Sequence, residues 1–360
     1  MISTTTSPTL WLDAAKAKAN LRFMSEKAAQ HGLALRPHLK TSQSIDVARW
    51  YREAGIRMIT VSSIAMAEYF AADGWDDITL AIPLNVRELP RILALASRIR
   101  LNLVIDSEEA VDALNGVGAT DPIRLFVKID AGYHRTGIPA TDHDRIGRLV
   151  DKIRTTPGLD YEGVLTHAGH SYTCRSHSEI RALHEEQLRQ LRPLKRFGGI
   201  VSIGDTPTCT VADDFSGIDE IRPGNFIYYD MKMVQISACE PDRISVCMVA
   251  PVISIHPDRN EVILHAGSVH FSKDSMTDAQ GNVSFGQVVR LTENGWGDPV
   301  EGAYVRSLCQ EHGFVTGPPE FIRSLRIGDL VGVLPVHSCL TADCMGEVRT
   351  LDGDRFAMMK

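Results

Sequence analysis

Between residues 33 and 223 the sequence alternates between short apolar runs and segments of helix-forming composition. Runs of Val, Ile and Leu that are separated by helices are typical of a parallel sheet whose outer side the helices cover. The runs that fit a buried strand lie at 33–38, 58–61, 78–82, 101–106, 123–130, 161–167, 200–204 and 218–223. These eight units predict a closed (β/α)8 TIM-type barrel, and an open doubly wound sheet is the alternative.

The first helices of this region carry stop signals. Segments of helix-forming composition at 13–31, 45–54 and 64–72 are each followed, directly or within two residues, by a glycine. Glycine is favoured just after a helix because it adopts the left-handed conformation without strain. We therefore expect three helices that end at these glycines.

The pattern changes after residue 235. The runs there, among them ISVCMVAPVISI (244–255), EVILHAG (261–267) and DLVGVLP (329–335), are rich in β-forming residues and are broken by Gly, Pro and Asn. No segment between them is helical enough to connect parallel strands, so an antiparallel arrangement is indicated. We expect the barrel to span residues 12–235 and a smaller antiparallel β domain to span residues 236–360.

Composition excludes several classes of protein. A formal net charge of −7 argues against nucleic acid or an anionic membrane surface as a partner that is held through bulk charge. Seven cysteines without a CxxC pair favour a reducing compartment over a disulfide framework. The N-terminus has no basic start before an apolar run, and no apolar stretch approaches about 18 residues. We therefore expect a cytoplasmic protein.

One lysine stands at the end of a predicted strand. In a parallel barrel, the catalytic groups lie on the loops that follow the strands. The first strand runs into RPHLKT (36–41), which places Lys40 at its end. A lysine amine that is partly removed from water forms a Schiff base with an aldehyde. A solvated lysine at a strand edge is the alternative.

The loops after the fifth and sixth strands carry cationic and aromatic groups. IDAGYHRTGI (129–138) contains Arg135, whose planar guanidinium can donate to a phenolate or a carboxylate. LTHAGHSY (165–172) contains His167 and Tyr172. A histidine there is a ligand, a ring-stacking group or a structural residue, and the sequence leaves these alternatives open.

The loops after the seventh and eighth strands are rich in glycine and hydroxyl groups. The candidate residues there are Gly204 and Thr206 in SIGDTPTC (202–209), and Gly224 and Asn225 in IRPGNFIYYD (221–230). Barrels commonly bind phosphate at the ends of these two strands, through backbone N–H groups and hydroxyls. A plain turn explains each motif separately, but it does not explain their joint position.

A histidine and a cysteine lie two positions apart in VLPVHSCLTADC (333–344), as His337 and Cys339. In an extended segment these side chains face the same side and can share a metal ion. Nitrogen and sulfur suit zinc better than magnesium. A buried cysteine beside a structural histidine is the alternative.

A lysine after the first strand, a phosphate cradle after the last two strands and a β domain after the barrel form the layout of fold-type III pyridoxal-phosphate enzymes. Within that layout the sequence resembles the D-serine dehydratase and D-threonine aldolase family. The strings that carry the resemblance are RPHLKT, GYHRTG, HAGHSY, GDTPT, RPGNFIYYD and HSC. They follow in the same order through most of the chain, so the resemblance is more specific than a single motif.

The resemblance implies a role for each candidate residue. Lys40 would hold pyridoxal 5′-phosphate through a Schiff base, with Arg135 near the ring oxygen, Tyr172 near the pyridine nitrogen and His167 also at the cofactor. The phosphate would lie among Gly204, Thr206, Gly224 and Asn225, and a divalent metal ion would bind His337 and Cys339. The resemblance further implies a homodimer, and it implies that residues 1–11 join the β domain.

The family acts on D-amino acids that carry a β-hydroxyl group. We expect a D-serine dehydratase, which releases pyruvate and ammonia, because Cys339 stands where the aldolases carry aspartate. A thiolate suits zinc, whereas an oxygen ligand suits manganese or magnesium. The alternatives are a D-threonine aldolase, which releases glycine and acetaldehyde, and a dehydratase or aldolase of D-threo-3-hydroxyaspartate. A non-catalytic pyridoxal-phosphate-binding protein and an amino-acid racemase represent other classes.

Two segments do not fit this scheme directly. Asp205 stands in GDTPT where many relatives have a small hydroxyl residue, and an acid near a phosphate is unfavourable unless it points away. HAGSVHFSKD (265–274) receives no role.

Overall fold

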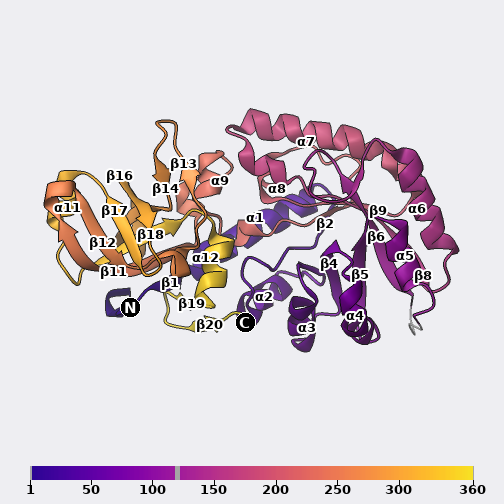
Figure 1. Cartoon of the computed structure of the whole chain (residues 1–360), viewed down its shortest axis with the longest axis horizontal. Coiled ribbons are helices and arrows are strands. Elements are labelled where there is room, and N and C mark those ends of the chain that lie inside the picture. The colour runs from indigo at the N-terminus through magenta and orange to yellow at the C-terminus, as the bar shows by residue number, and fades with distance from the viewer. Residues whose placement is uncertain (1, 118–121, 360) are drawn as a thin grey trace. The chain divides into compact units, whose positions relative to one another are not determined.

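The computed structural model describes residues 2–117 and 122–359 (Figure 1). The chain forms two compact units. The barrel unit comprises Phe23–Lys40 and Arg49–Gly224, and the β unit comprises Met1–Arg22, Thr41–Ala48 and Asn225–Lys360. The chain therefore passes between the units four times, after Arg22, Lys40, Ala48 and Gly224. The last crossing lies at Gly224, and the expected boundary lay at residue 235.

The barrel unit contains eight parallel strands in the order β2-β10-β9-β8-β6-β5-β4-β3. Their bounds are β2 (Ala34–Leu35), β3 (Ile59–Val61), β4 (Asp77–Pro83), β5 (Arg100–Ile105), β6 (Ile123–Asp130), β8 (Leu159–Leu165), β9 (Ile200–Ile203) and β10 (Glu220–Ile221), and the short β7 (Ile138–Pro139) pairs with β6. A parallel bridge between His38 and Thr60 joins the two ends of this order. The predicted barrel is thus confirmed.

The first strand is shorter than predicted, because Pro37 has no N–H group to donate to the ladder. The chain nevertheless stays extended past β2. The N–H of His38 donates to the carbonyl oxygen of Pro223 (2.9 Å), and that of Leu39 donates to Thr60 (2.9 Å). A turn follows at Leu39 and Lys40.

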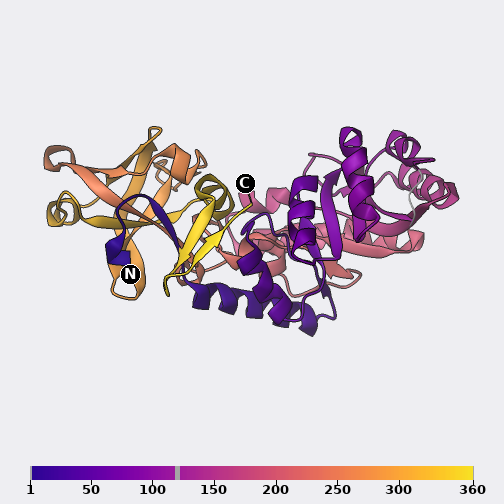
Figure 2. The ribbon, with the colours of Figure 1, turned by 90° about the horizontal axis from the view of Figure 1, so that it is seen from below.

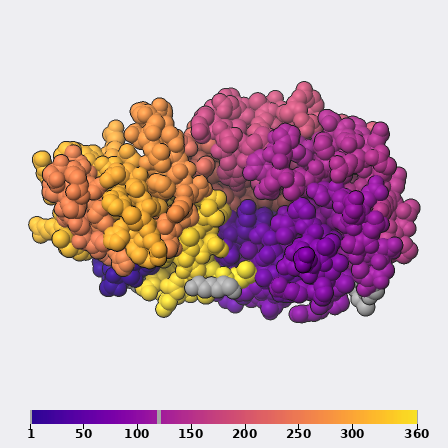
Figure 3. All heavy atoms as spheres, viewed as in Figure 1, coloured from indigo at the N-terminus to yellow at the C-terminus, as the bar shows by residue number. Residues whose placement is uncertain are grey.

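Helices alternate with the strands and lie on their outer side (Figure 1). They are α2 (Ile45–Glu53), α3 (Ile64–Ala72), α4 (Leu89–Ala96), α5 (Glu108–Leu114), α6 (His143–Thr155), α7 (His177–Leu191) and α8 (Thr206–Val211), with 3-10 helices at Val86–Glu88, Gly169–Thr173 and Arg192–Phe197. In the space-filling view, the purple and magenta segments that carry these helices fill the visible face of the barrel unit (Figure 3). No helix within the described residues is long and apolar enough to cross a membrane.

The β unit contains a sheet in the order β12-β17-β16-β15-β18-β11-β1-β19-β20 (Figure 2 shows β19 and β20 in yellow). The strands are β1 (Thr9–Leu12), β11 (Val246–His256), β12 (Glu261–His265), β15 (Gly286–Thr292), β16 (Gly295–Leu308), β17 (His312–Thr316), β18 (Leu330–Pro335), β19 (Glu347–Thr350) and β20 (Arg355–Ala357); β13 (Met276–Thr277) pairs separately with β14 (Val283–Ser284). All pairings in the large sheet are antiparallel except that of β1 with β19. The predicted antiparallel character is confirmed, and β1 lies between β11 and β19.

Five helices accompany this sheet or lead away from it. They are α1 (Ala14–Gln30), α9 (Met231–Gln235), α10 (Ser268–Phe271), α11 (Pro319–Ser324) and α12 (Ser338–Met345), and 3-10 helices lie at Ile2–Thr4, Asn225–Ile227, Pro241–Arg243 and Pro257–Arg259. Gly32, which we expected to end the first helix, has a φ of 64° and donates to the carbonyl oxygen of Ala29 (3.1 Å). The left-handed conformation explains why glycine stands there.

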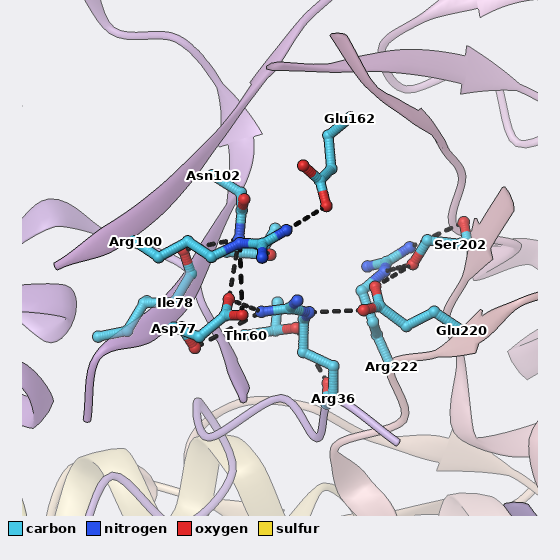
Figure 4. A network of polar contacts seen from close by, with 11 residues as sticks. Arg36, Thr60, Asp77, Ile78, Arg100, Asn102, Glu162, Ser202, Glu220 and Arg222 are labelled. Carbon is cyan, nitrogen blue, oxygen red and sulfur yellow. Dashed lines mark hydrogen bonds and ion pairs between the residues drawn. The ribbon is translucent and has the colours of Figure 1, made fainter. Parts of the chain in front are cut away.

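A chain of buried polar contacts ties the first strand to the rest of the barrel (Figure 4). Arg36 donates from Nε to Oε2 of Glu220 (2.6 Å) and from Nη1 to Oδ1 of Asp77 (2.5 Å). Glu220 accepts at its other oxygen from Oγ of Ser202 (2.6 Å), which itself accepts from Nε of Arg222 (2.7 Å). Because β3 separates β2 from β4 in the sheet, the contact between Arg36 and Asp77 passes through the interior of the barrel.

Replacing Arg36 by methionine should strongly destabilise the protein. The substitution leaves the carboxylate of Glu220 buried without its cation, and an uncompensated buried charge costs about 3 to 5 kcal/mol. Urea unfolding followed by circular dichroism measures the loss. As a control, Arg91→Met removes a solvent-exposed ion pair with Glu68 and should leave the midpoint nearly unchanged. Equal midpoints for the two variants would contradict the role of Arg36.

Candidate active site

Lys40 lies on the turn that follows the bridge at the closing seam of the barrel. Its side chain is exposed, and its backbone N–H donates to Nδ1 of His38 (3.4 Å). Burial, together with the positive charges of Lys40 and Arg222, lowers the pKa of His38 well below its usual value. Lys40 therefore offers an accessible amine at the carboxyl end of the first strand, next to a neutral imidazole.

His167 and Gly204 meet at the ends of β8 and β9. Nδ1 of His167 hydrogen-bonds the carbonyl oxygen of Gly204, and since a carbonyl only accepts, Nδ1 carries the proton. Burial lowers the pKa of His167 well below its usual value; the bond to Gly204 opposes this, and the charges of Arg135 and Lys40 lower it further. A Cβ on residue 204 would lie 3.0 Å from Cβ of the buried Arg222, so a larger residue here would be tightly packed against Arg222.

The start of α8 forms the candidate phosphate cradle. The N–H of Thr206 donates to the hydroxyl of Tyr172 (3.3 Å). The hydroxyl of Thr206 is buried and has no hydrogen-bond partner among the described residues. A phosphate oxygen would satisfy this hydroxyl. The residues present therefore fit the phosphate. The structure places the Tyr172 hydroxyl at the cradle, and its contact with a pyridine nitrogen stays a prediction.

Asp205 is held by hydrogen bonds within the chain. Its carboxylate caps α8 and accepts from the N–H of Thr208 (2.8 Å), the hydroxyl of Thr208 (2.8 Å) and the hydroxyl of Ser171 (3.0 Å). Burial raises the pKa of Asp205 to about 6, and these three hydrogen bonds limit the rise. The acid in GDTPT is therefore a helix cap, which explains its place beside a phosphate cradle.

Arg135 is presented by a loop that Asp130 shapes. Oδ1 of Asp130 accepts from the N–H of His134 (2.9 Å), which adopts a left-handed φ of 57°. The exposed guanidinium of Arg135 lies over the ring of Tyr133, 5.3 Å from its centre. Its charge contributes to the lowered pKa of His167, so both groups lie at the same end of the barrel.

Lys128 is a residue of this region that the sequence analysis missed. It lies in β6, 5% exposed, and its Nζ donates to the carbonyl oxygen of Ile129 (3.2 Å). Burial, followed by the charges of Arg222 and Arg135, lowers the pKa of Lys128 to about 7. The available signal was a lysine inside the otherwise apolar run IRLFVKID, where a charged side chain must point into the barrel or be solvated.

His337 and Cys339 lie close together, but the segment that carries them does not have the predicted conformation. The segment is not extended: His337 caps α12, and Cys339 lies in the first turn of that helix. The imidazole hydrogen-bonds both Cys339 and Asp274, the latter from Nδ1 to Oδ2 (2.8 Å). Burial acts to lower the pKa of His337, but the bonds to Asp274 and Cys339 and the charges of Cys339 and Asp230 raise it to about 10.

The sulfur of Cys339 has two further neighbours. The hydroxyl of Thr41 lies 3.2 Å from Sγ, and Nδ2 of Asn225 lies 3.7 Å from it. The same Nδ2 donates to Oδ2 of Asp230 (2.6 Å). The structure therefore brings the Asn225 side chain to the histidine–cysteine pair, while Gly224, the residue before it, is the last residue of the barrel unit.

The donor set of the pair fits a zinc ion. A hydrogen bond between imidazole and thiol shows that one nitrogen and one sulfur converge, and these atoms are preferred zinc ligands. Within residues 2–117 and 122–359, no group of three or more His, Cys, Asp or Glu side chains is arranged to hold a metal. The protein would thus supply two ligands and leave positions open for water or substrate, as catalytic zinc sites do.

The comparisons with known proteins agree with this arrangement. The family model of the alanine racemase N-terminal domain matches residues 12–232, and a model described as a serine dehydratase domain matches residues 245–351. D-threo-3-hydroxyaspartate dehydratase of Delftia sp. (strain HT23) is 32% identical over 93% of this chain and 91% of its own length. D-serine dehydratase of Dictyostelium discoideum is 29% identical over 92% of this chain and 89% of its own length.

Solved structures give the same result. The D-threo-3-hydroxyaspartate dehydratase from Delftia sp. HT23 superposes with a TM-score of 0.90 at 28% identity, over 99% of this chain and 98% of that chain. A cysteine-to-alanine mutant of D-threo-3-hydroxyaspartate dehydratase was solved in a metal-free form (TM-score 0.90, 29% identity, 99% and 98% coverage). D-threonine aldolase from Filomicrobium marinum shares the fold, with a TM-score of 0.81 at 19% identity, over 99% and 96%.

The barrel, the β unit and the lysine after the first strand define the class of fold-type III pyridoxal-phosphate proteins. The chain belongs to the alanine racemase-like family and, by its second half, to the branch that contains the serine dehydratases.

Asp205→Asn should stabilise the protein increasingly as pH rises. The folded-state pKa of Asp205 is raised from 3.8 to about 6, so the wild type carries no penalty below pH 3.8 and the full penalty above pH 6. A shift of this size corresponds to about 3 kcal/mol. Asparagine keeps a cap oxygen and cannot ionise. Urea unfolding of both proteins between pH 4 and 7 tests this, and a difference that does not change with pH would contradict the buried-acid account.

Proposed function

We propose that the chain is a pyridoxal-phosphate-dependent lyase that dehydrates D-serine or a closely related D-β-hydroxy amino acid. The observation that carries the proposal is the convergence of His337 and Cys339, in a chain whose first barrel strand leads to Lys40. Relatives across nine-tenths of the chain are a D-threo-3-hydroxyaspartate dehydratase and a D-serine dehydratase. A cysteine-to-alanine mutant of a D-threo-3-hydroxyaspartate dehydratase was solved in a metal-free form, which supports the expectation that this kind of protein binds a metal.

The barrel residues bind the cofactor and move a proton. Lys40 would hold the cofactor through its amine, and this accessible amine would accept the proton of the substrate α-carbon. Arg135 donates to the ring oxygen. Backbone groups of Gly204 and Gly224, with the N–H and hydroxyl of Thr206, hold the phosphate. Bound pyridoxal phosphate supplies an electron sink for charge at the α-carbon, and bound zinc supplies a Lewis acid for the β-hydroxyl.

Three further residues complete the assignment. His167, held neutral and fixed by its bond to Gly204, presents its ring to the cofactor. Tyr172, on the loop after β8, would contact the pyridine nitrogen of the cofactor. The backbone of Asn225 continues the phosphate cradle, while its side chain donates to Sγ of Cys339.

A second candidate substrate is D-threo-3-hydroxyaspartate. The 32% identical relative is a dehydratase of this compound. The extra carboxylate of D-threo-3-hydroxyaspartate, which D-serine lacks, needs a cation in the site. The exposed guanidinium of Arg135 offers one. Cleavage of D-threonine to glycine and acetaldehyde is the alternative reaction, since the fold is shared with an aldolase.

The remaining expectations are proposals of the same kind. The metal is zinc, because the donors are nitrogen and sulfur. The working form is a homodimer in the cytoplasm. The small molecule that it binds as substrate is a D-amino acid. A net charge of −7 supports the expectation that neither nucleic acid nor a membrane takes part.

Purified protein with pyridoxal phosphate and zinc should convert D-serine to pyruvate and ammonia. A chelator should abolish this activity, because the β-hydroxyl then lacks its Lewis acid. Lys40→Ala should lose both the visible absorbance of lysine-bound pyridoxal phosphate and at least about a thousandfold in kcat. The assay couples pyruvate to lactate dehydrogenase and resolves glycine by chromatography.

Lys195→Ala serves as the matched control, because this exposed lysine pairs with Asp219 on the outside of the barrel unit and should retain activity. Glycine and an aldehyde from D-threonine, without pyruvate from D-serine, would transfer the assignment to aldolase. Racemisation that survives the chelator would overturn the lyase proposal.

A further inference from the structure

HAGSVHFSKD, which the sequence analysis left without a role, ends at Asp274 on the loop after α10. The left-handed φ of Ser272 (71°) closes the helix, and Oγ of Ser272 accepts from the N–H of Asp274 (3.2 Å). Oδ1 of Asp274 accepts from the N–H of Ser275 (3.1 Å). Its other oxygen, Oδ2, lies 2.8 Å from Nδ1 of His337. Both carboxylate oxygens are therefore held in place.

The loop that carries Asp274 is anchored on the helix that carries the cysteine. The hydroxyl of Thr341, one turn along α12 from His337, donates to the carbonyl oxygen of Phe271 at the end of α10 (3.1 Å). This contact fixes α10 against α12. Asp274 and His337 are thus parts of one rigid arrangement within the β unit, rather than two side chains that meet by chance.

The bond to Asp274 decides which ring nitrogen of His337 is available. A carboxylate only accepts hydrogen bonds, so Nδ1 must carry a proton. Nε2 is then the ring nitrogen that does not contact Asp274 and can bind a metal ion. In metal sites, a carboxylate behind a ligating histidine fixes its tautomer and ring orientation in this way.

The second acid near His337 is Asp230, and its carboxylate accepts hydrogen bonds from other groups. Oδ2 of Asp230 accepts from Nδ2 of Asn225 (2.6 Å) and from the N–H of Ser338 (3.0 Å), and Oδ1 accepts from the N–H of Met233 (3.1 Å). Asp230 therefore supports the backbone at the start of α12. Orientation of the imidazole is left to Asp274.

We infer that Asp274 is the positioning residue of the metal-binding histidine: it holds the proton of His337 on Nδ1 and aims Nε2, with Sγ of Cys339, at one metal ion. The inference rests on the proposed function, which assigns His337 and Cys339 to a metal. It gives the unassigned segment 265–274 a task, which is to carry the acid that prepares the metal site before any metal is bound.

Cobalt titration of the full-length, metal-stripped protein tests this inference independently of turnover. Cobalt bound to a thiolate gives a charge-transfer absorbance, and zinc competition then gives the zinc affinity. Asp274→Ala should weaken binding about 10- to 100-fold, as the loss of a carboxylate behind a histidine ligand does. Asp274→Asn keeps the shape without the charge and should lose less. Asp278→Ala, whose carboxylate bonds only within its own turn, should bind as the wild type does.

The tautomer of His337 provides a readout that a purely structural role would not move, and it needs no folded variant at position 274. Nitrogen-15 NMR of the zinc-loaded wild type, with the signal assigned by its loss in His337→Gln, should show the proton on Nδ1 and the metal on Nε2. A metal on Nδ1 with the proton on Nε2, or cobalt affinities of both Asp274 variants within about twofold of the wild type, would overturn the inference. Failure of the wild type to bind cobalt or zinc would overturn the metal assignment, and the inference with it.

Discussion

The barrel depends on the salt bridges that Arg36 makes inside it. This guanidinium, 2% exposed, joins the first strand to Glu220 of the last strand and to Asp77 of β4, across the seam where the parallel sheet closes (Figure 4). Two cations and two anions balance along the path from Asp77 to Arg222, so the burial of charge is compensated. Arg222, at the end of this path, donates to the carbonyl oxygen of Thr166, the residue before His167. The salt bridges that close the barrel and the candidate site residue His167 are therefore linked by one network of contacts.

The residues that would hold the cofactor stand where the chain leaves the barrel. Lys40 and Gly224 are the last barrel-unit residues before the two crossings that lead from the barrel unit into the β unit, and the next residues, Thr41 and Asn225, belong to the β unit. There both of them contact Sγ of Cys339. The peptide bonds at these two crossings therefore connect Lys40 and Gly224 directly to two residues that contact Sγ of Cys339. A barrel alone, as in a non-catalytic carrier, has no counterpart of this connection.

Much of the fold could be predicted because local sequence patterns determine its elements. Buried parallel strands require unbroken apolar runs, so all eight barrel strands were found, and residues that directly follow a strand could be named as site candidates without any contact information. The conformation around Cys339 was predicted wrongly. The run before it is a strand, but a helix begins at Ser338, and the only local hint was Gly346, whose left-handed φ of 66° ends that helix.

What was missed depends on partners far apart in the sequence. Asp274 bonds a histidine 63 positions away, and Arg36 bonds an acid 184 positions away. Lys128 becomes special only because the barrel buries it near Arg135 and Arg222. For Asp274 and Arg36 no local pattern distinguishes the side chain from a solvated charge, and for Lys128 the apolar strand around it was the one available signal.

The central claim, that Lys40 carries the cofactor, is tested most directly by borohydride reduction of the protein loaded with pyridoxal phosphate, followed by peptide mass mapping. Reduction fixes the cofactor on the lysine that holds it. The account predicts a phosphopyridoxyl adduct on the peptide that contains Lys40 and an unmodified peptide for the buried Lys128. An adduct on Lys128 or on another lysine, or no adduct at all, would contradict it.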